Sequence, residues 1–155
     1  MTGWLREPSI VRDLGRALAD LLPDADPTVV VGPATSGYPL GALLAVEMGA
    51  GFVGVQKERR ALADSDVWLN ASTPLDYRGR NLELTVRKRL LTTADRVVIV
   101  DDWVDTGGQA FAVQEIVRRS GARLLGTVAV VDALTDHAVR RRLGLRSLLN
   151  LRDVR

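Results

Sequence analysis

Three carboxylates and a glycine turn stand together between residues 101 and 108. Asp101 and Asp102 follow Val-Val-Ile-Val at 97–100, and four β-branched residues in a row indicate a strand buried on both faces. Asp105 comes three residues later, and Thr106-Gly107-Gly108 then opens an amphipathic helix. Carboxylates at the end of a central strand lie where open α/β sheets bind ligands, and free N–H groups at a helix start favour a phosphate. One loop therefore offers acceptors for hydroxyl groups and donors for a phosphate, and a phosphorylated sugar carries both.

The run Val-Val-Ile-Val-Asp-Asp-x-x-Asp-Thr-Gly-Gly closely resembles the phosphoribosyl-pyrophosphate (PRPP) signature of type I phosphoribosyltransferases. The resemblance implies that Asp101 and Asp102 hold the ribose 2′- and 3′-hydroxyls. It also implies that the turn after them holds the 5′-phosphate through Asp105, Thr106, Gly107, Gly108 and Gln109. Gln109 stands where many members have Thr, and a Gln amide can also donate. An ordinary βα turn is the alternative, but three carboxylates within five residues repel one another, which favours a binding site.

A second loop, Gly-Pro-Ala-Thr-Ser-Gly at 32–37, joins an expected strand at 28–31 to an expected helix at about 38–48. Small residues let the backbone approach a ligand, and the helix start favours an anion. The segment 29–57 resembles the same region of adenine phosphoribosyltransferases, in which the loop binds pyrophosphate and the next strand ends in Lys. Ser36 stands where those enzymes usually carry Arg. The resemblance implies pyrophosphate contacts from Ala34, Thr35, Ser36, Gly37 and Lys57.

The stretch from residue 56 to residue 80 is polar and irregular, and loops of this length in a compact domain are usually functional lids or disordered. Type I enzymes carry a flexible loop here, at about 57–80, that closes over PRPP and excludes water. Lys57, Arg59 and Arg60 are candidates to neutralise charge on the departing pyrophosphate, and a solvated basic loop is the alternative. Trp68 and Leu69 are candidates for a hairpin arm or a subunit contact, and residues 81–87 for a strand returning to the sheet.

The remaining pattern alternates strands with helices. We expect helices at 8–22 and within 132–144, and strands at 124–131 and 145–151. This alternation predicts an α/β fold with a mostly parallel central sheet flanked by helices. We expect a single phosphoribosyltransferase domain over residues 1–155. The resemblance adds a small C-terminal hood over the base at about 132–155, with no side-chain pattern that matches a particular base.

Composition excludes several other classes of protein. The 155 residues are 46% hydrophobic, which suits one compact domain. The absence of cysteine excludes a thiol nucleophile and a disulfide framework, and the single histidine, His137, excludes a multi-histidine metal site. No signal-peptide pattern and no apolar run of about 20 residues is present, so we expect a cytoplasmic protein without a membrane partner. Arg140-Arg141-Arg142 lacks interleaved aromatic residues, which favours a solvated helix face over a nucleic-acid contact.

The activity implied by the resemblance is transfer of 5-phosphoribose from PRPP to a nitrogenous base, expected to be a purine, with release of pyrophosphate. The expected cofactor is Mg²⁺, held mainly by PRPP oxygens and water rather than by a protein cage. Asp105 is the candidate general base, and capping of the following helix is its alternative role. A homodimer is expected from the resemblance alone.

Two other functions stay open. One is a non-catalytic regulatory protein of the same fold that binds PRPP or a nucleotide. The other is a phosphoribosyltransferase for a non-purine acceptor. Asp101, Asp102, Lys57 and the long basic loop favour an enzyme, because a sensor needs no loop cations for a leaving group.

Overall fold

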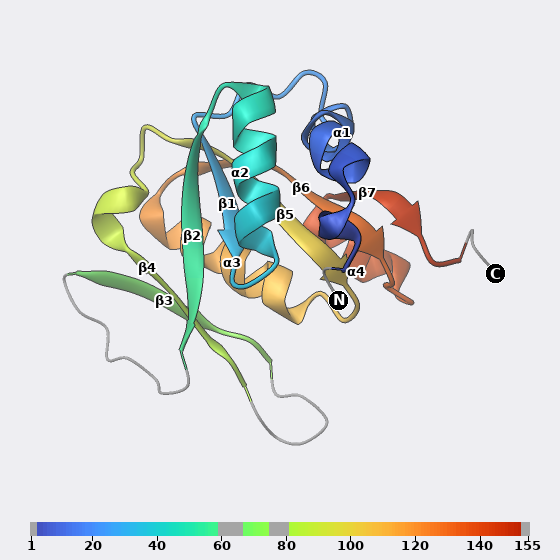
Figure 1. Ribbon diagram of the computed structural model, residues 1–155. Helices are drawn as coiled ribbons and strands as arrows, with labels where there is room; N and C mark the ends of the chain where they lie inside the picture. The colour runs from blue at the N-terminus through green and yellow to red at the C-terminus, as the bar shows by residue number, and fades with distance from the viewer. Residues whose placement is uncertain (1–2, 59–66, 75–80, 153–155) are drawn as a thin grey trace.

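The computed structural model describes residues 3–58, 67–74 and 81–152, and Figure 1 shows a central sheet with helices on both faces. Arg59 and Arg60, predicted to neutralise the leaving group, lie outside the described residues. The strands are β1 (Val29–Pro33), β2 (Gly51–Glu58), β3 (Trp68–Ser72), β4 (Glu83–Arg87), β5 (Arg96–Val104), β6 (Arg123–Asp132) and β7 (Leu145–Asn150). The helices are α1 (Pro8–Ala19), α2 (Gly37–Met48), α3 (Gly108–Ser120) and α4 (His137–Leu143), with short 3₁₀ helices η1 (Gly3–Arg6) and η2 (Lys88–Leu90).

The described strands form one sheet in the order β3-β4-β2-β1-β5-β6-β7. The five strands from β2 to β7 in this order run parallel, whereas β4 is antiparallel to β2 and β3 is antiparallel to β4. The prediction of a mostly parallel α/β sheet is confirmed. The predicted hairpin arm is also confirmed, because Trp68 and Leu69 lie in β3 and the strand expected at 81–87 is β4.

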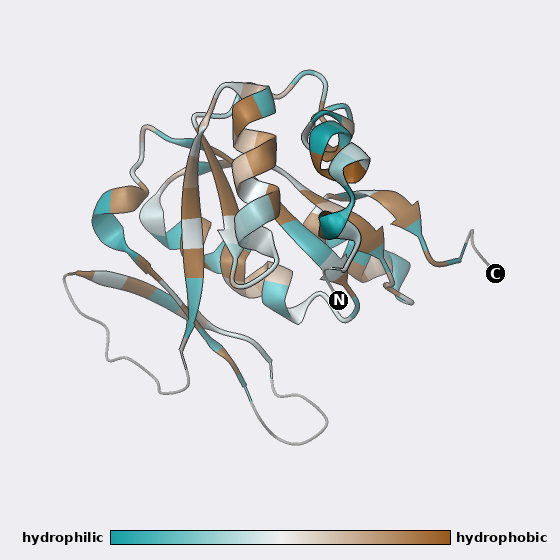
Figure 2. Cartoon of the chain, in the orientation of Figure 1, coloured by the Kyte–Doolittle hydropathy of each residue, from teal (hydrophilic) through white to brown (hydrophobic). Residues whose placement is uncertain are grey.

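Strand β5 is buried on both faces, as the sequence predicted. Val98 and Val100 pack with α1 and α2 on one face, and Val97 and Ile99 pack with α3 on the other. Figure 2 shows the hydrophobic residues along the strands beneath α2 and on the inner side of α1. Each buried branched side chain contributes roughly 1.5–3 kcal/mol. The strand also continues through Val104, so the paired carboxylates lie within it rather than after it.

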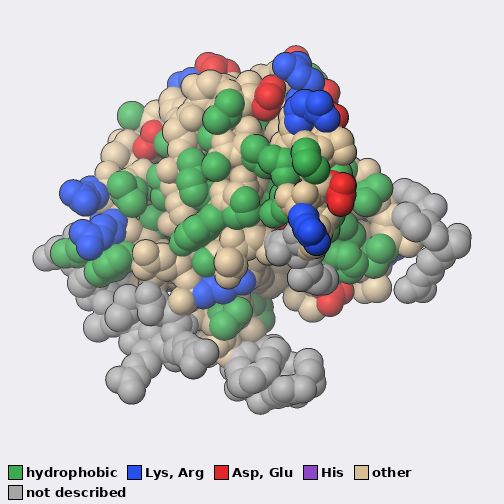
Figure 3. All heavy atoms as spheres, viewed as in Figure 1, with side chains coloured by type: hydrophobic (Ala, Val, Ile, Leu, Met, Phe, Trp, Pro, Cys, Tyr) green, Lys and Arg blue, Asp and Glu red, His purple; other side chains and the backbone are tan. Residues whose placement is uncertain are grey.

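Helix α1 ends at Ala19, before the predicted end at residue 22. Pro23 disfavours a helical backbone at Leu22, and residues 20–22 form a turn in which Leu22 is buried. Figure 3 shows the α1–α2 face, with hydrophobic side chains exposed over α2. Val46 of α2 is 80% exposed, and Pro39 and Ala42 on the same outer stripe are also exposed. Exposed apolar side chains gathered on one helix face are typical of a contact surface.

The C-terminal segment predicted as a hood holds α4 and the edge strand β7, which is hydrogen-bonded to β6. The prediction of a solvated arginine face is wrong for Arg140, because its guanidinium forms an ion pair with the buried carboxylate of Asp132. Asp132 ends β6, and the guanidinium offsets the cost of burying its carboxylate. Arg141 is exposed as expected, and Arg142 lies over the Phe111 ring. No helix in the described ranges is long and apolar enough to cross a membrane.

Candidate active site

The adjacent carboxylates of Asp101 and Asp102 near the end of β5 interact with each other but differ in their surroundings. Asp101 continues the row of Val97 and Ile99 toward α3 and is only 4% exposed. Asp102 continues the row of Val98 and Val100 and lines an apolar pocket on the α1 side. The predicted ribose-binding pair is therefore divided between two environments.

The turn after β5 forms a small cavity of about 180 Å³ above Asp101. Gly107 is the N-cap of α3 with φ +80°, a conformation that favours glycine. It provides no side-chain cap, so the backbone N–H groups at the start of α3 are available to an anion. The cavity brings together five predicted PRPP residues, and Gly108 lines the adjoining groove; the five are Asp101, Asp105, Thr106, Gly107 and Gln109.

The predicted general base, Asp105, is exposed at this turn. Within the described part of the chain, its carboxylate makes no hydrogen bond to the start of α3. The alternative role of capping that helix therefore has no support from the geometry. The position is compatible with a proton acceptor at the edge of the cavity.

Both carboxylate oxygens of Asp101 accept hydrogen bonds. Gln109 Nε2 donates to Oδ2 at 2.6 Å, and the Asp102 backbone N–H donates to Oδ1 at 2.9 Å. Burial nevertheless raises the pKa of Asp101 from 3.8 to about 7, opposed by the two hydrogen bonds and reinforced by the neighbouring Asp102 carboxylate. The site therefore holds a carboxylate that is costly to ionise.

This raised pKa gives a testable stability effect. Between about pH 4 and about pH 7 the folded chain holds a proton that the unfolded chain has released, so stability from this group is lost as pH rises through that window. We expect Asp101→Asn to increase the free energy of unfolding at about pH 8 by on the order of 1–3 kcal/mol and to flatten its pH dependence. Urea denaturation across the window measures this, with the exposed Asp24→Asn as control. Parallel pH profiles for wild type and Asp101→Asn would contradict it.

The predicted pyrophosphate loop, Ala34 to Gly37, follows β1, the strand between β2 and β5. A Cβ on Gly32 would lie 2.2 Å from the Gly37 carbonyl oxygen, so glycine is required for this tight turn. The Ala34–Thr35 peptide is cis, and the Ala34 N–H donates to the Val55 carbonyl at 2.8 Å. This bond fixes the loop at the same edge of the sheet as the β5 turn.

Lys57 is exposed near the end of β2, two residues beyond Val55, the register partner of Pro33. Parallel strands end at one edge of the sheet, so Lys57, the 34–37 loop and the β5 turn share that edge. Those predicted site residues that the structure describes therefore lie along one edge of the sheet.

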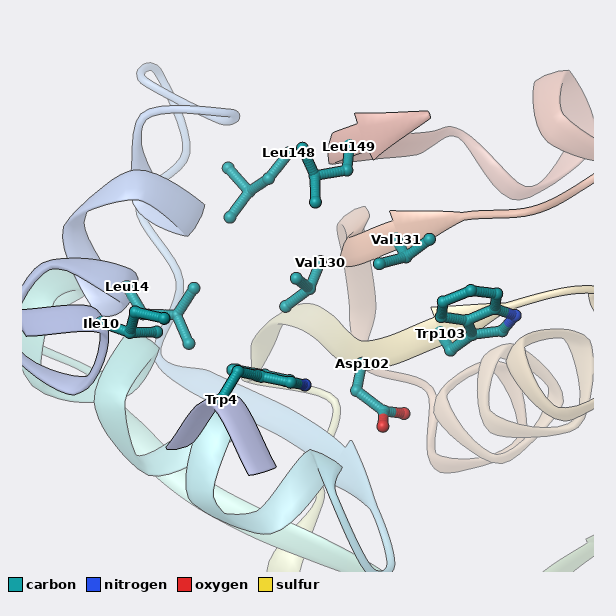
Figure 4. Close-up of a pocket in the computed structure, with 9 residues that line it drawn as sticks. All are labelled: Trp4, Ile10, Leu14, Asp102, Trp103, Val130, Val131, Leu148 and Leu149. Atoms are coloured by element: carbon teal, nitrogen blue, oxygen red, sulfur yellow. The ribbon is translucent and has the colours of Figure 1, made fainter. Parts of the chain in front are cut away.

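An apolar pocket of about 540 Å³ was not predicted from the sequence. Figure 4 shows Asp102 lying between Trp4 of η1 and Trp103 of β5. The pocket has an aliphatic wall formed by Ile10, Leu14, Val130, Val131, Leu148 and Leu149. Trp103 lines this pocket and also the cavity over the turn, so the two spaces adjoin. The sequence signal that could have indicated this pocket is Trp103, which stands between Asp102 and Asp105.

Comparisons with known proteins agree with this geometry. The family model described as "phosphoribosyl transferase domain" matches residues 4–147. An adenine phosphoribosyltransferase of Synechococcus sp. is 35% identical over 131 residues, covering 84% of this chain and 74% of the relative. The crystal structure of adenine phosphoribosyltransferase from Rhodothermus marinus has a TM-score of 0.79 at 30% identity, covering 94% of this chain and 82% of that one. The Saccharomyces cerevisiae enzyme, complexed with an imino-altritol bisphosphate and adenine, has a TM-score of 0.75 at 27% identity, covering 92% and 80%.

Proposed function

The chain belongs to the phosphoribosyltransferase family, and we propose that its site transfers 5-phosphoribose from PRPP to a purine base and releases pyrophosphate. The observation that carries this proposal is the shared wall at Trp103. It separates a polar cavity at a helix start from an apolar pocket suited to a flat ring. A phosphoribose held by the phosphate turn and by Asp102 would present its anomeric carbon between the two spaces.

In this arrangement the N–H groups of the turn, Thr106 to Gln109, hold the 5′-phosphate and Asp102 holds a ribose hydroxyl. The loop at 34–37 and Lys57 bind the pyrophosphate that leaves. The bond from the anomeric carbon to pyrophosphate breaks, a bond to the ring nitrogen forms, and Asp105 accepts the proton that the base loses. The two indole rings hold the base by stacking.

Mg²⁺ is part of the proposal. Among the described residues, no three His, Cys, Asp or Glu side chains gather as a metal site. We propose that the ion is bound mainly by phosphate oxygens and water, as is usual for Mg²⁺. Bound in that way, Mg²⁺ would neutralise charge on the pyrophosphate group.

A homodimer and a cytoplasmic location, both expected from the resemblance, complete the proposal. The apolar outer stripe of α2, formed by Pro39, Ala42 and Val46, supports the homodimer because it is a surface suited to a contact with another chain. Sedimentation measures the mass of wild type and of Val46→Glu in solution. We expect wild type to be a dimer and the variant, which carries a charge on the contact surface, to be a monomer. A wild-type monomer at micromolar concentration would argue against the assembly.

The acceptor pocket gives a direct prediction. Trp103→Ala removes one aromatic wall, and we expect the KM for the base to rise about tenfold while the KM for PRPP changes by less than about twofold. Initial rates at varied base and varied PRPP measure the two constants. Leu90→Ala, a partly exposed residue on η2 outside the site, is the control. Equal increases in the KM for the base and the KM for PRPP would show that the indole maintains the structure of the whole site rather than binding the base.

Asp105→Asn tests the general base. We expect kcat to fall about tenfold with PRPP affinity unchanged, a small effect for a general base because Asp105 is exposed and water can accept the proton in its place. Single-turnover rates and calorimetric PRPP affinity separate the two quantities. Loss of PRPP binding would instead place Asp105 among the phosphate-binding groups.

The proposed function is tested by pyrophosphate release from PRPP and Mg²⁺ with adenine, guanine, hypoxanthine, xanthine, uracil and orotate. The two solved relatives described above are adenine phosphoribosyltransferases, so adenine is the acceptor that we expect to support release. Release should be lost in the Asp101→Asn, Asp102→Asn double variant. Release with uracil or orotate alone would favour a non-purine acceptor. PRPP binding without release would favour the regulatory alternative, and absence of PRPP binding would overturn the proposal.

A further inference from the structure

Gln109 connects helix α3 to strand β5 through a single side-chain contact. It is the second residue of α3, and its amide Nε2 donates to Asp101 Oδ2 at 2.6 Å. The other carboxylate oxygen accepts the Asp102 backbone N–H. Both oxygens of a carboxylate that is 4% exposed are therefore occupied within the protein.

The surroundings of Asp101 explain why such a donor is needed. Asp102 on β5 and Asp105 on the turn are the titratable groups beside it, and both are acidic. The neighbours contributed by α3 and β6, namely Gln109, Ala110 and Ala129, do not titrate. No lysine, arginine or histidine among the described residues lines the cavity. An ionised Asp101 thus depends on neutral donors for its stabilisation.

We propose that Gln109 is a positioning residue that acts through Asp101, with its amide holding the Asp101 carboxylate against the phosphate turn and leaving Asp102 as the acid open to the ribose. A threonine side chain at this position is two bonds shorter, so its hydroxyl would stay near the start of α3. The longer glutamine side chain reaches the Asp101 carboxylate on β5. An amide also has a second N–H, which stays directed away from Asp101.

The two acids then have different tasks. Asp101 fixes the geometry of the turn, and Asp102 contacts substrate. The substrate part of this inference rests on the proposed function, whereas the contact between Gln109 and Asp101 exists without ligand. A test therefore needs one arm without ligand and one arm with PRPP.

The arm without ligand follows the ¹³C chemical shift of the Asp101 carboxyl carbon against pH in wild type and Gln109→Met. Methionine has nearly the same length and no donor, so we expect the Asp101 midpoint to rise by about one pH unit. Gln114→Met is the matched control, because Gln114 lies on the same helix and bonds to Thr127 and to the Leu143 carbonyl instead. An unchanged midpoint in Gln109→Met would overturn the inference.

The arm with PRPP is a double-mutant cycle on the calorimetric Kd of the full chain with Mg²⁺. We expect Gln109→Met alone to weaken binding about tenfold and to add less than about twofold in the Asp101→Asn background. Effects that multiply would identify Gln109 as a direct phosphate ligand and overturn the positioning role. A wild-type chain that binds no PRPP would refute the proposed function, while the carboxyl titration would still decide the contact.

Discussion

Asp102→Asn is expected to weaken PRPP binding by about 10–100-fold, because a charge-assisted contact to a ribose hydroxyl becomes a neutral one, a loss of about 1–3 kcal/mol. Asp102 is the partly exposed member of the acidic pair. Its carboxylate lies at the apolar pocket between Trp4 and Trp103, where little water competes for it. Calorimetry with PRPP and Mg²⁺ measures the change directly.

The controls for this experiment are chosen from the structure. Asp24→Asn removes an exposed carboxylate from the turn between α1 and β1, outside the predicted site, and should leave the PRPP affinity unchanged. Asp101→Asn should weaken binding less than Asp102→Asn does, since the buried carboxylate is already bonded on both oxygens. Unchanged affinity in Asp102→Asn would remove it from the ribose site. A larger effect in Asp101→Asn would assign the ribose to the buried acid instead.

The local parts of the site were predictable from the sequence because local chemistry determines them. Four β-branched residues before Asp101 specify a buried strand, and Thr106-Gly107-Gly108 specifies a turn into a helix. The loop at 32–37 is determined in the same way, since glycine at 32 and 37 is required where the two backbones meet. Helices α2 and α3 begin within a residue or two of the predicted positions, whereas β5 extends beyond the predicted residues 97–100 as far as Val104.

The parts that depend on distant residues were not predictable. The pocket needs Trp4 from the first described turn of the chain and Leu148 and Leu149 from the last strand, and no local pattern joins them. The ion pair of Arg140 with Asp132 likewise forms only when α4 packs against the end of β6. In both cases the tertiary arrangement creates an environment that neither segment specifies alone.

The different burial of Asp101 and Asp102 is an intermediate case. A strand that ended before the acids would leave both carboxylates in one exposed loop. The strand instead continues because β6 pairs with it as far as Val104, opposite Asp132. Once the strand includes both acids, Asp101 is buried and Asp102 remains partly exposed at the apolar pocket. The missing information was the length of the partner strand.

Gly107→Ala is expected to lower the free energy of unfolding by about 2–4 kcal/mol and to weaken PRPP binding more than tenfold. Two penalties combine at this position. Its φ of +80° disfavours any Cβ, and the added Cβ would lie 2.8 Å from Val139 Cγ1 and 3.1 Å from Leu143 Cδ1. Relief of that overlap requires either α4 or the turn to move, and movement of the turn misaligns the N–H groups that face the phosphate. Urea denaturation and PRPP calorimetry measure the two effects.

Gly49→Ala separates the two penalties. Gly49 also has a positive φ, +64°, but a Cβ there would meet no atom within 4 Å. It should therefore show the backbone penalty alone, about 1 kcal/mol, with PRPP affinity unchanged. The difference between the variants measures how tightly α4 supports the turn. Equal losses of stability with PRPP affinity retained in both variants would contradict this expectation. That result would mean that α4 moves aside at no measurable free-energy cost and that the Gly107 backbone, rather than packing against α4, determines the shape of the turn.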